Sequence, residues 1–93
     1  MESALGQAIQ KRLVISFLYE GSFRTVEPYL LGINEQGHQA LSAWQLSGGS
    51  GQGWREFLLS KLAALSIGQQ TFQPVRAGYN PNDSRMARIQ YRV

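Results

Sequence analysis

The sequence of 93 residues contains no cysteine, one histidine and one aspartate. Without cysteine the chain forms neither a disulfide nor a thiolate metal site. A single histidine, His38, cannot be the centre of a histidine metal cluster, and no Ser-His-Asp or Cys-His set can be assembled around it. The glutamates show no spacing typical of a general acid and base pair. We therefore expect no enzyme activity, no metal and no cofactor.

Charged residues are also scarce, at 16% of the chain, and no apolar run is long enough to span a membrane. A hydrophobic fraction of 43% is typical of a globular domain and not of a disordered chain. Nothing resembles a signal peptide, so we expect a cytoplasmic protein with no membrane partner. Nine basic residues against six acidic ones give a net charge of +3, which permits nucleic acid or phosphate as a partner.

The length predicts one small domain, residues 1–93, with a single core. Apolar residues near the start follow the spacing of one helical face: Leu5, Ala8, Ile9 and Leu13. They predict an amphipathic helix over about residues 3–13, with Ser3 as its N-cap. Alternating patterns then predict five or six short antiparallel strands. We expect a mainly β fold, with a small barrel over about residues 14–72 and a C-terminal turn and strand over residues 73–93.

The first hairpin can be aligned from its turn. Gly21-Ser22 suits a two-residue type II′ turn, which places Tyr19 opposite Arg24 and Phe17 opposite Val26. Because side chains alternate along a strand, these four residues share one face. Two residues with polar tips thus end an apolar face, and a guanidinium there must reach the rim or find a partner. This end of the hairpin is a candidate site.

A second hairpin is predicted to return over His38–Gln45. The glycine-rich residues 48–53 are interpreted as a mobile connector, because they lack the lysine and the strand-to-helix context of a phosphate-binding loop. In the following strand, Arg55 shares a face with Phe57, so a second arginine stands at the head of an apolar row, with Lys61 at its other end.

The rest of the chain is less regular. Residues 62–67 suit either a short strand or a turn of helix, and residues 69–74 are predicted to be a connector that Phe72 anchors in the core. After a run of turn formers over residues 78–83, the alternation of residues 89–93 predicts a half-exposed final strand.

Several of these segments together resemble the WYL domain family. They are Tyr19, GSFRTVEP at 21–28, HQALSAW at 38–44, WREFLLSKL at 54–62, and Phe72. Their order and spacing match the family over about three quarters of the chain. The specific parts are an arginine four residues before a proline, and R-x-F followed by a basic residue and a leucine. The name-giving Trp-Tyr-Leu falls on Gln39-Ala40-Leu41, so only the leucine is kept.

The resemblance implies an Sm-like or SH3-like β-barrel that acts as a regulatory ligand-sensing module of bacterial transcription regulation. The implied ligands are single-stranded nucleic acids or nucleotides. Members usually follow a helix-turn-helix domain, so we expect this chain to be a stand-alone copy or a piece of a larger regulator. The family's ligand-contacting positions fall on Arg24 and Arg55, with Tyr19 beside them, His38 near the rim and Lys61 before the leucine.

Each candidate residue also has a plainer interpretation. Arg24 and Arg55 can be surface charges that pair with nearby glutamates or backbone carbonyls, and Tyr19 can be a core residue. Trp44 and Trp54 flank the glycine run and can stack on bases, although core packing is more typical. Three further arginines can either follow a phosphate backbone or protect an edge strand from pairing: Arg85, Arg88 and Arg92.

Two hypotheses of different class follow. In the first, the domain binds a nucleotide or single-stranded nucleic acid through Arg24, Arg55 and Tyr19. In the second, the barrel is a protein-interaction or oligomerisation module that uses its exposed edge strands, with a vestigial ligand pocket because the Trp-Tyr pair is lost. The partner is then another protein or a second copy of the chain.

Overall fold

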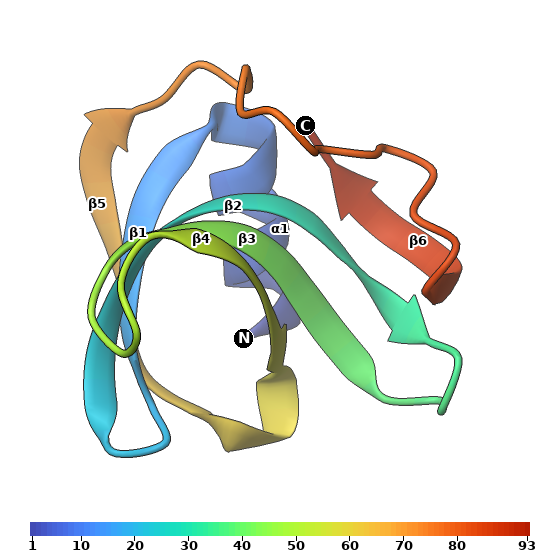
Figure 1. Ribbon diagram of the computed structural model, residues 1–93, viewed down its shortest axis with the longest axis horizontal. Coiled ribbons are helices and arrows are strands. Elements are labelled where there is room, and N and C mark those ends of the chain that lie inside the picture. The colour runs from blue at the N-terminus through green and yellow to red at the C-terminus, as the bar shows by residue number, and fades with distance from the viewer.

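In the computed structural model, which describes residues 1–93, one helix precedes six strands (Figure 1). The elements in chain order are α1 (Glu2–Lys11), β1 (Leu13–Tyr19), β2 (Ser22–Asn34), β3 (Gln39–Ser47), β4 (Gly53–Leu58), the 3₁₀ turn η1 (Leu59–Lys61), β5 (Leu62–Thr71) and β6 (Met86–Arg92). The mainly β class and the N-terminal helix predicted from the sequence are confirmed. The helix, ten residues long, is too short to cross a bilayer.

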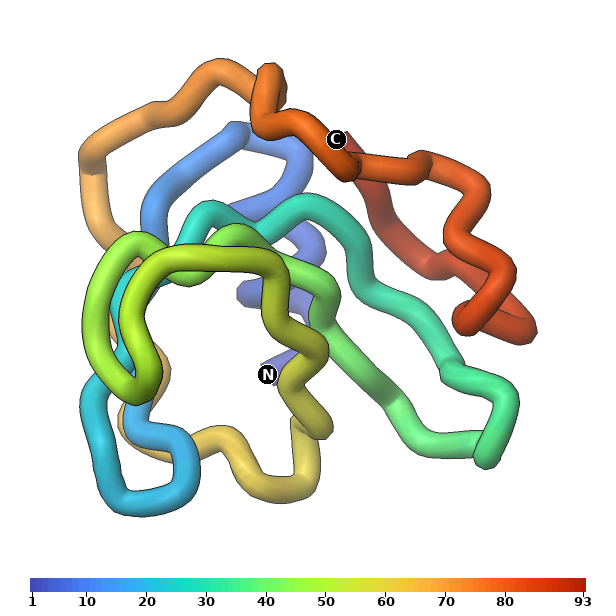
Figure 2. The backbone as a smooth tube through the Cα atoms, in the orientation of Figure 1, coloured from blue at the N-terminus to red at the C-terminus, as the bar shows by residue number.

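All strand pairs are antiparallel, and the sheet runs in the order β4-β3-β2-β1-β5, with β6 added to β2. The long strand β2 is central, because its first half pairs with β1, its second half pairs with β6, and β3 runs along its other edge. The chain trace curls strongly around one interior (Figure 2). The end strands β4 and β5 do not pair with each other, so the hydrogen bonds do not close the predicted barrel.

The first hairpin forms around a different turn from the predicted one. Its central residues are Glu20 and Gly21, whose φ angles of 49° and 82° suit a type I′ turn. Phe17 therefore lies opposite Arg24 and not Val26, two residues away from the predicted register. Because the shift is an even number of residues, every side chain keeps its predicted face.

The helix boundaries also differ slightly from the prediction. The N-cap position is Met1, which makes no side-chain capping hydrogen bond, and Ser3 lies inside the first turn. Ser3 is therefore not the cap. The helix ends at Arg12, whose φ of 57° is left-handed and whose backbone N–H donates to the carbonyls of Ala8 and Ile9.

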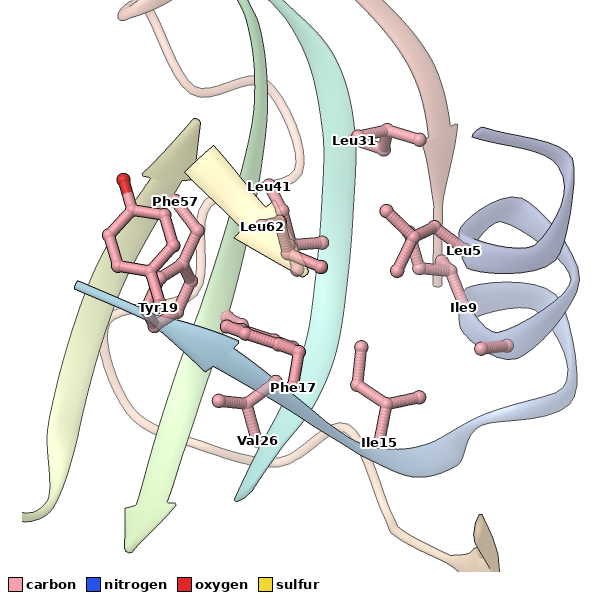
Figure 3. Close-up of a cluster of buried hydrophobic side chains, with 12 residues drawn as sticks. Leu5, Ile9, Ile15, Phe17, Tyr19, Val26, Leu31, Leu41, Phe57 and Leu62 are labelled. Atoms are coloured by element: carbon pink, nitrogen blue, oxygen red, sulfur yellow. The ribbon is translucent and has the colours of Figure 1, made fainter. Parts of the chain in front are cut away.

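The main core lies on what we call the inner face of the sheet (Figure 3). Leu5 and Ile9 project from α1 toward this face, as the helical spacing predicts. Twelve buried residues from α1 and five strands form the cluster: Leu5, Ala8, Ile9, Ile15, Phe17, Tyr19, Val26, Leu31, Leu41, Ala43, Phe57 and Leu62. Helix α1 thus covers one end of the curled sheet.

A second apolar cluster lies on the opposite, outer face, under the segment between β5 and β6. We call this segment, residues 72–85, the strap. Tyr29 is buried beneath it together with Phe72, the first residue of the strap, and Trp44, Trp54 and the strap residue Tyr79 pack against them. Strands β2 and β3 are therefore covered on both faces, and the prediction of a single core is wrong. Strand β5 extends to Thr71, into the residues predicted to be a connector.

Candidate functional site

Arg24 lies on the inner face at the start of β2 and is half-buried. Its guanidinium carbon lies 5.7 Å from the ring centroid of Tyr19 and 6.0 Å from that of Phe57. All three of its hydrogen bonds go to neutral oxygens: Nε donates to Ser22 Oγ at 2.8 Å, Nη2 to the Tyr19 carbonyl at 3.2 Å, and Nη1 to Gln45 Oε1 at 3.1 Å. No carboxylate pairs with Arg24, so its positive charge is not neutralised.

Gln45 connects Arg24 to the glycine loop, residues 48–53. Its side chain is fully buried, and its amide nitrogen donates to the carbonyls of Gly48 at 2.8 Å and Gly51 at 2.7 Å. The same amide accepts the hydrogen bond from Arg24 through its oxygen. The loop that composition suggested to be a mobile connector is thus tied to the sheet by a core side chain.

Arg55 reaches the same loop from β4. Its Nη2 donates to Ser50 Oγ at 2.8 Å and to the Gly51 carbonyl at 3.2 Å, while its Nη1 donates to the carbonyl of the preceding residue at 2.8 Å. Arg55, like Arg24, has no carboxylate partner. The structure therefore brings the two arginines singled out from the sequence to one loop, where the Gly51 carbonyl accepts from both Gln45 and Arg55.

The glycine loop adds backbone donors to these side chains. The backbone N–H groups of Gly49, Ser50 and Gln52 donate to no other group of the protein. Glycine is favoured at position 49 because its φ of 52° is left-handed, and a Cβ there would lie 2.5 Å from Arg24 Nη1 and displace the guanidinium. Free amides beside unpaired guanidiniums attract an anion. We call this cluster of Arg24, Arg55 and the glycine loop the arginine-loop site.

Tyr19 does not offer a ring face to a ligand. It is 7% exposed, and its ring packs edge to face on Phe57 with a centroid distance of 4.9 Å. Its hydroxyl oxygen accepts a hydrogen bond from the Leu58 N–H at 3.0 Å. Its carbonyl and its ring instead hold Arg24 in place, so the geometry makes Tyr19 a buried support for the site, in agreement with its plainer interpretation as a core residue.

His38 and Lys61 are not joined to the arginine-loop site. His38 is exposed in the β2–β3 turn, where its backbone N–H donates to Asn34, at the end of β2 opposite Arg24. Lys61 is exposed at the end of η1 and makes no hydrogen bond or ion pair. Family position suggested both residues, and Lys61 also stood at the end of the apolar row that Arg55 heads; the structure gives neither of them a partner in the site.

The two tryptophans beside the glycine loop belong to the outer cluster. Trp54 Nε1 donates to the Ala77 carbonyl of the strap at 2.7 Å, and the Trp54 ring stacks with that of Tyr79 at an interplanar angle of 22°. Trp44 meets Trp54 edge to face, with ring centroids 5.6 Å apart. Their positions agree with the plainer interpretation, in which both are packing residues.

An ion pair that the sequence did not reveal holds the strap. Arg76 donates to both carboxylate oxygens of Glu27, at 2.9 and 3.1 Å, and its guanidinium lies 5.1 Å from the ring centroid of Trp44. The hydrogen bond to Glu27 raises the pKa of Arg76 above its ordinary value. Beneath the strap, burial raises the pKa of Tyr29. Arg76 and Glu27 therefore carry a structural role.

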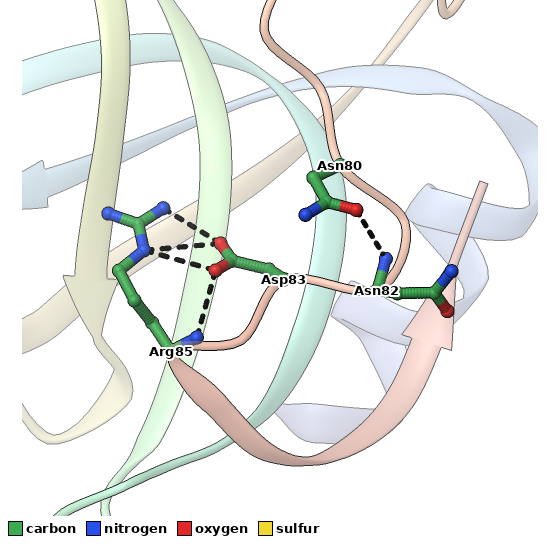
Figure 4. Close-up of polar contacts among 4 residues, drawn as sticks. All are labelled: Asn80, Asn82, Asp83 and Arg85. Atoms are coloured by element: carbon green, nitrogen blue, oxygen red, sulfur yellow. Dashed lines mark hydrogen bonds and ion pairs between the residues drawn. The ribbon is translucent and has the colours of Figure 1, made fainter.

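The C-terminal arginines do not form a free basic stripe. Arg85 is paired with Asp83 at 2.8 Å (Figure 4), and this hydrogen-bonded pair lowers the pKa of Asp83. Arg92 donates to the Pro81 carbonyl at 3.1 Å. Two small cavities of about 180 and 150 Å³ border Arg85, and no residue of the arginine-loop site lines either of them.

No family model, curated protein or solved structure matches this chain. The resemblance to the WYL family therefore stays a prediction from the sequence.

Proposed function

We propose that this domain is a ligand-binding module that recognises the phosphate groups of a nucleotide or of single-stranded nucleic acid at the arginine-loop site. The observation that carries the proposal is the position of two half-buried guanidiniums at one glycine loop, neither with a carboxylate partner. Arg76 and Arg85, by contrast, are each paired with an acid. An unpaired guanidinium held by neutral acceptors keeps its full charge for an incoming anion.

The hydrogen bonds of the site leave donors available. Arg24 and Arg55 each make three hydrogen bonds, and a guanidinium has five N–H groups, so each retains about two for a ligand. Gly49 and Ser50, whose backbone N–H groups are free, lie against Arg24 and Arg55 respectively. A phosphate, with several oxygens and at least one negative charge, can accept from both kinds of donor.

The fold is compatible with the regulatory role that the WYL resemblance implies. We assign the curled sheet to the Sm-like or SH3-like class, supported by its N-terminal helix, its order of antiparallel strands and the η1 turn that joins the end strands β4 and β5. In this assignment the arginine-loop site is the sensor, and the regulated process depends on the proteins to which the module is coupled.

The test compares binding of a fluorescent ten-residue oligothymidylate and of inorganic pyrophosphate by wild type and by Arg24→Lys/Arg55→Lys. Lysine keeps the charge but loses the planar fork, so we expect at least about ten-fold weaker binding of both probes. Arg24→Ala/Arg55→Ala should abolish binding. Urea unfolding of each variant checks that it is folded.

Arg88→Ala is the matched control, because Arg88 is exposed and makes no ion pair. It should bind as wild type does. Wild-type affinity for the oligonucleotide should also fall steeply with salt, as phosphate contacts require. Folded double variants that bind both probes like wild type would show that the site is wrong.

A role in protein interaction or oligomerisation is the second candidate, and the composition of β5 favours it. This end strand pairs only with β1, contains no charged residue and is mostly exposed. Unprotected edges of this kind can pair with another chain. However, irregularities in the β1–β5 register interrupt the strand, and bulges hinder edge pairing. We therefore prefer phosphate binding, and light scattering over a range of concentrations tests for self-association.

A further inference from the structure

We infer that Phe23 is a base-stacking residue beside the arginine-loop site, so that the ligand is a single-stranded nucleic acid and not a free phosphate or pyrophosphate. This inference rests on the proposed function, and it adds a residue to which neither the sequence patterns nor the family resemblance gave a role. It follows from the exposure of Phe23, from its position next to Arg24, and from the two glycines, Gly48 and Gly49, that pack against Phe23 and Arg24.

Phe23 is 66% exposed, whereas every other aromatic side chain of the chain is buried or partly buried. It directly precedes Arg24 in β2 and pairs across the hairpin with Leu18. Alternation places its ring on the outer face, while Arg24 lies on the inner face. The two side chains therefore project on either side of the strand at the same end of β2.

The glycine loop contacts the backbone of Phe23 and the side chain of Arg24 through residues that have no side chain. Gly48 packs directly on the Phe23 backbone, because a Cβ at Gly48 would collide with the Phe23 carbonyl oxygen. The next residue, Gly49, packs on the Arg24 guanidinium. Two successive residues that bridge Phe23 and Arg24 thus have no side chain. A nucleic acid strand can cross this bare backbone with a phosphate at the arginine-loop site and a base on the ring.

The surroundings of Phe23 suit a neutral base carried by an anionic backbone. The neighbours on its face of the sheet are Leu18 and Thr25, and Ala63 follows beyond Leu18. None of these three residues is charged, and the nearest carboxylate along the hairpin is that of Glu20, which is exposed in the turn. An exposed aromatic ring beside a basic surface is the usual arrangement for binding single strands with little base preference.

The experiment compares Phe23→Leu and Phe23→Trp with wild type, using the oligothymidylate and inorganic pyrophosphate as probes. Leucine keeps an apolar side chain but cannot stack, so Phe23→Leu should bind the oligonucleotide about ten-fold more weakly and pyrophosphate unchanged. Phe23→Trp should bind the oligonucleotide at least as tightly as wild type. Val75→Leu is the control, since Val75 is also exposed and apolar but lies on the strap.

The outcomes separate the two proposals. If Phe23→Leu binds the oligonucleotide as wild type does, or loses both probes equally, the stacking role is wrong although phosphate binding stands. If wild type binds pyrophosphate as tightly as the oligonucleotide, the preference for nucleic acid is likewise wrong. If wild type binds neither probe, the proposed function fails, and the stacking role fails with it.

Discussion

Arg24 and Gln45 are joined by a hydrogen bond of 3.1 Å from Nη1 to Oε1, which links a half-buried charge to a fully buried amide. Because the same amide donates to two carbonyls of the glycine loop, Gln45 contacts both the guanidinium and the loop. The site is therefore coupled to the protein interior through Gln45, in addition to the contacts that the core residue Tyr19 makes with Arg24.

Gln45→Leu should lower the free energy of unfolding by about 1–3 kcal/mol, because it leaves buried hydrogen-bonding groups without a partner. The Gly51 N–H, which donates to the Gly48 carbonyl at 3.0 Å, should exchange faster with solvent as the loop loosens. Urea unfolding and amide hydrogen exchange measure the two effects. Gln52→Leu, on the exposed part of the loop, is the control and should change neither. Equal stability of Gln45→Leu and wild type would contradict the coupling.

Arg76→Met should destabilise the protein and release the strap, because Glu27 is only 6% exposed and would lose its ionic partner. Tryptophan fluorescence reports this change, since the emission of Trp54 and Trp44 should shift to longer wavelength when the strap leaves their rings. The double variant Glu27→Gln/Arg76→Met should lose less stability than the sum of the two single variants. Strictly additive losses would mean that the pair is not coupled.

Stability should fall at alkaline pH as the buried phenol of Tyr29 ionises. Its pKa in the folded protein is raised by burial, so the neutral form is favoured. This contribution is fully present below the ordinary pKa of 10.0 and is lost as the pH rises through the raised value. Tyr29→Phe should weaken the dependence of unfolding free energy on pH above about 10. The burial of Tyr79 acts in the same direction, so Tyr29→Phe/Tyr79→Phe should weaken it further.

Gly6→Ala should destabilise the protein although alanine favours helices. A Cβ at Gly6 would lie 2.6 Å from ring atoms of Tyr91, and overpacking of this kind costs about 1–3 kcal/mol against a helical gain of about 1 kcal/mol. Thermal unfolding tests the net effect. In a Tyr91→Leu background the same change should be neutral or stabilising. If Gly6→Ala is still destabilising in that background, the clash with the Tyr91 ring is not the cause of the destabilisation.

The face of each strand could be predicted from the sequence, whereas the register could not. Alternation places Arg24 and Arg55 on the face that carries the core, and the structure agrees. The turn was misplaced because Gly21-Ser22 suits a two-residue turn, whereas the protein puts Glu20 at a φ of 49°, a conformation that residues other than glycine rarely adopt. The predicted faces of the side chains were still correct, because the register differs from the predicted one by two residues, which is an even number.

Other features lacked a local pattern. Glu27 and Arg76 are 49 positions apart, so no periodicity relates them, and the strap above Tyr29 was predicted only as a connector and turns. Gln45 could have been noticed, because it alternates with Ala43 on an inward row, where a polar side chain needs partners. Its partners, however, are carbonyls of the glycine loop, and a sequence does not show where backbone groups point.

The anchoring of the glycine loop by Gln45 has a consequence for protein engineering. If these six residues alone were transplanted onto another scaffold, the loop would lose the side-chain hydrogen bonds that hold its conformation. The graft must also carry a buried glutamine on one flanking strand and an arginine on each of two others, in the same register. The unit that must be transferred therefore consists of the loop together with parts of three strands, β2, β3 and β4.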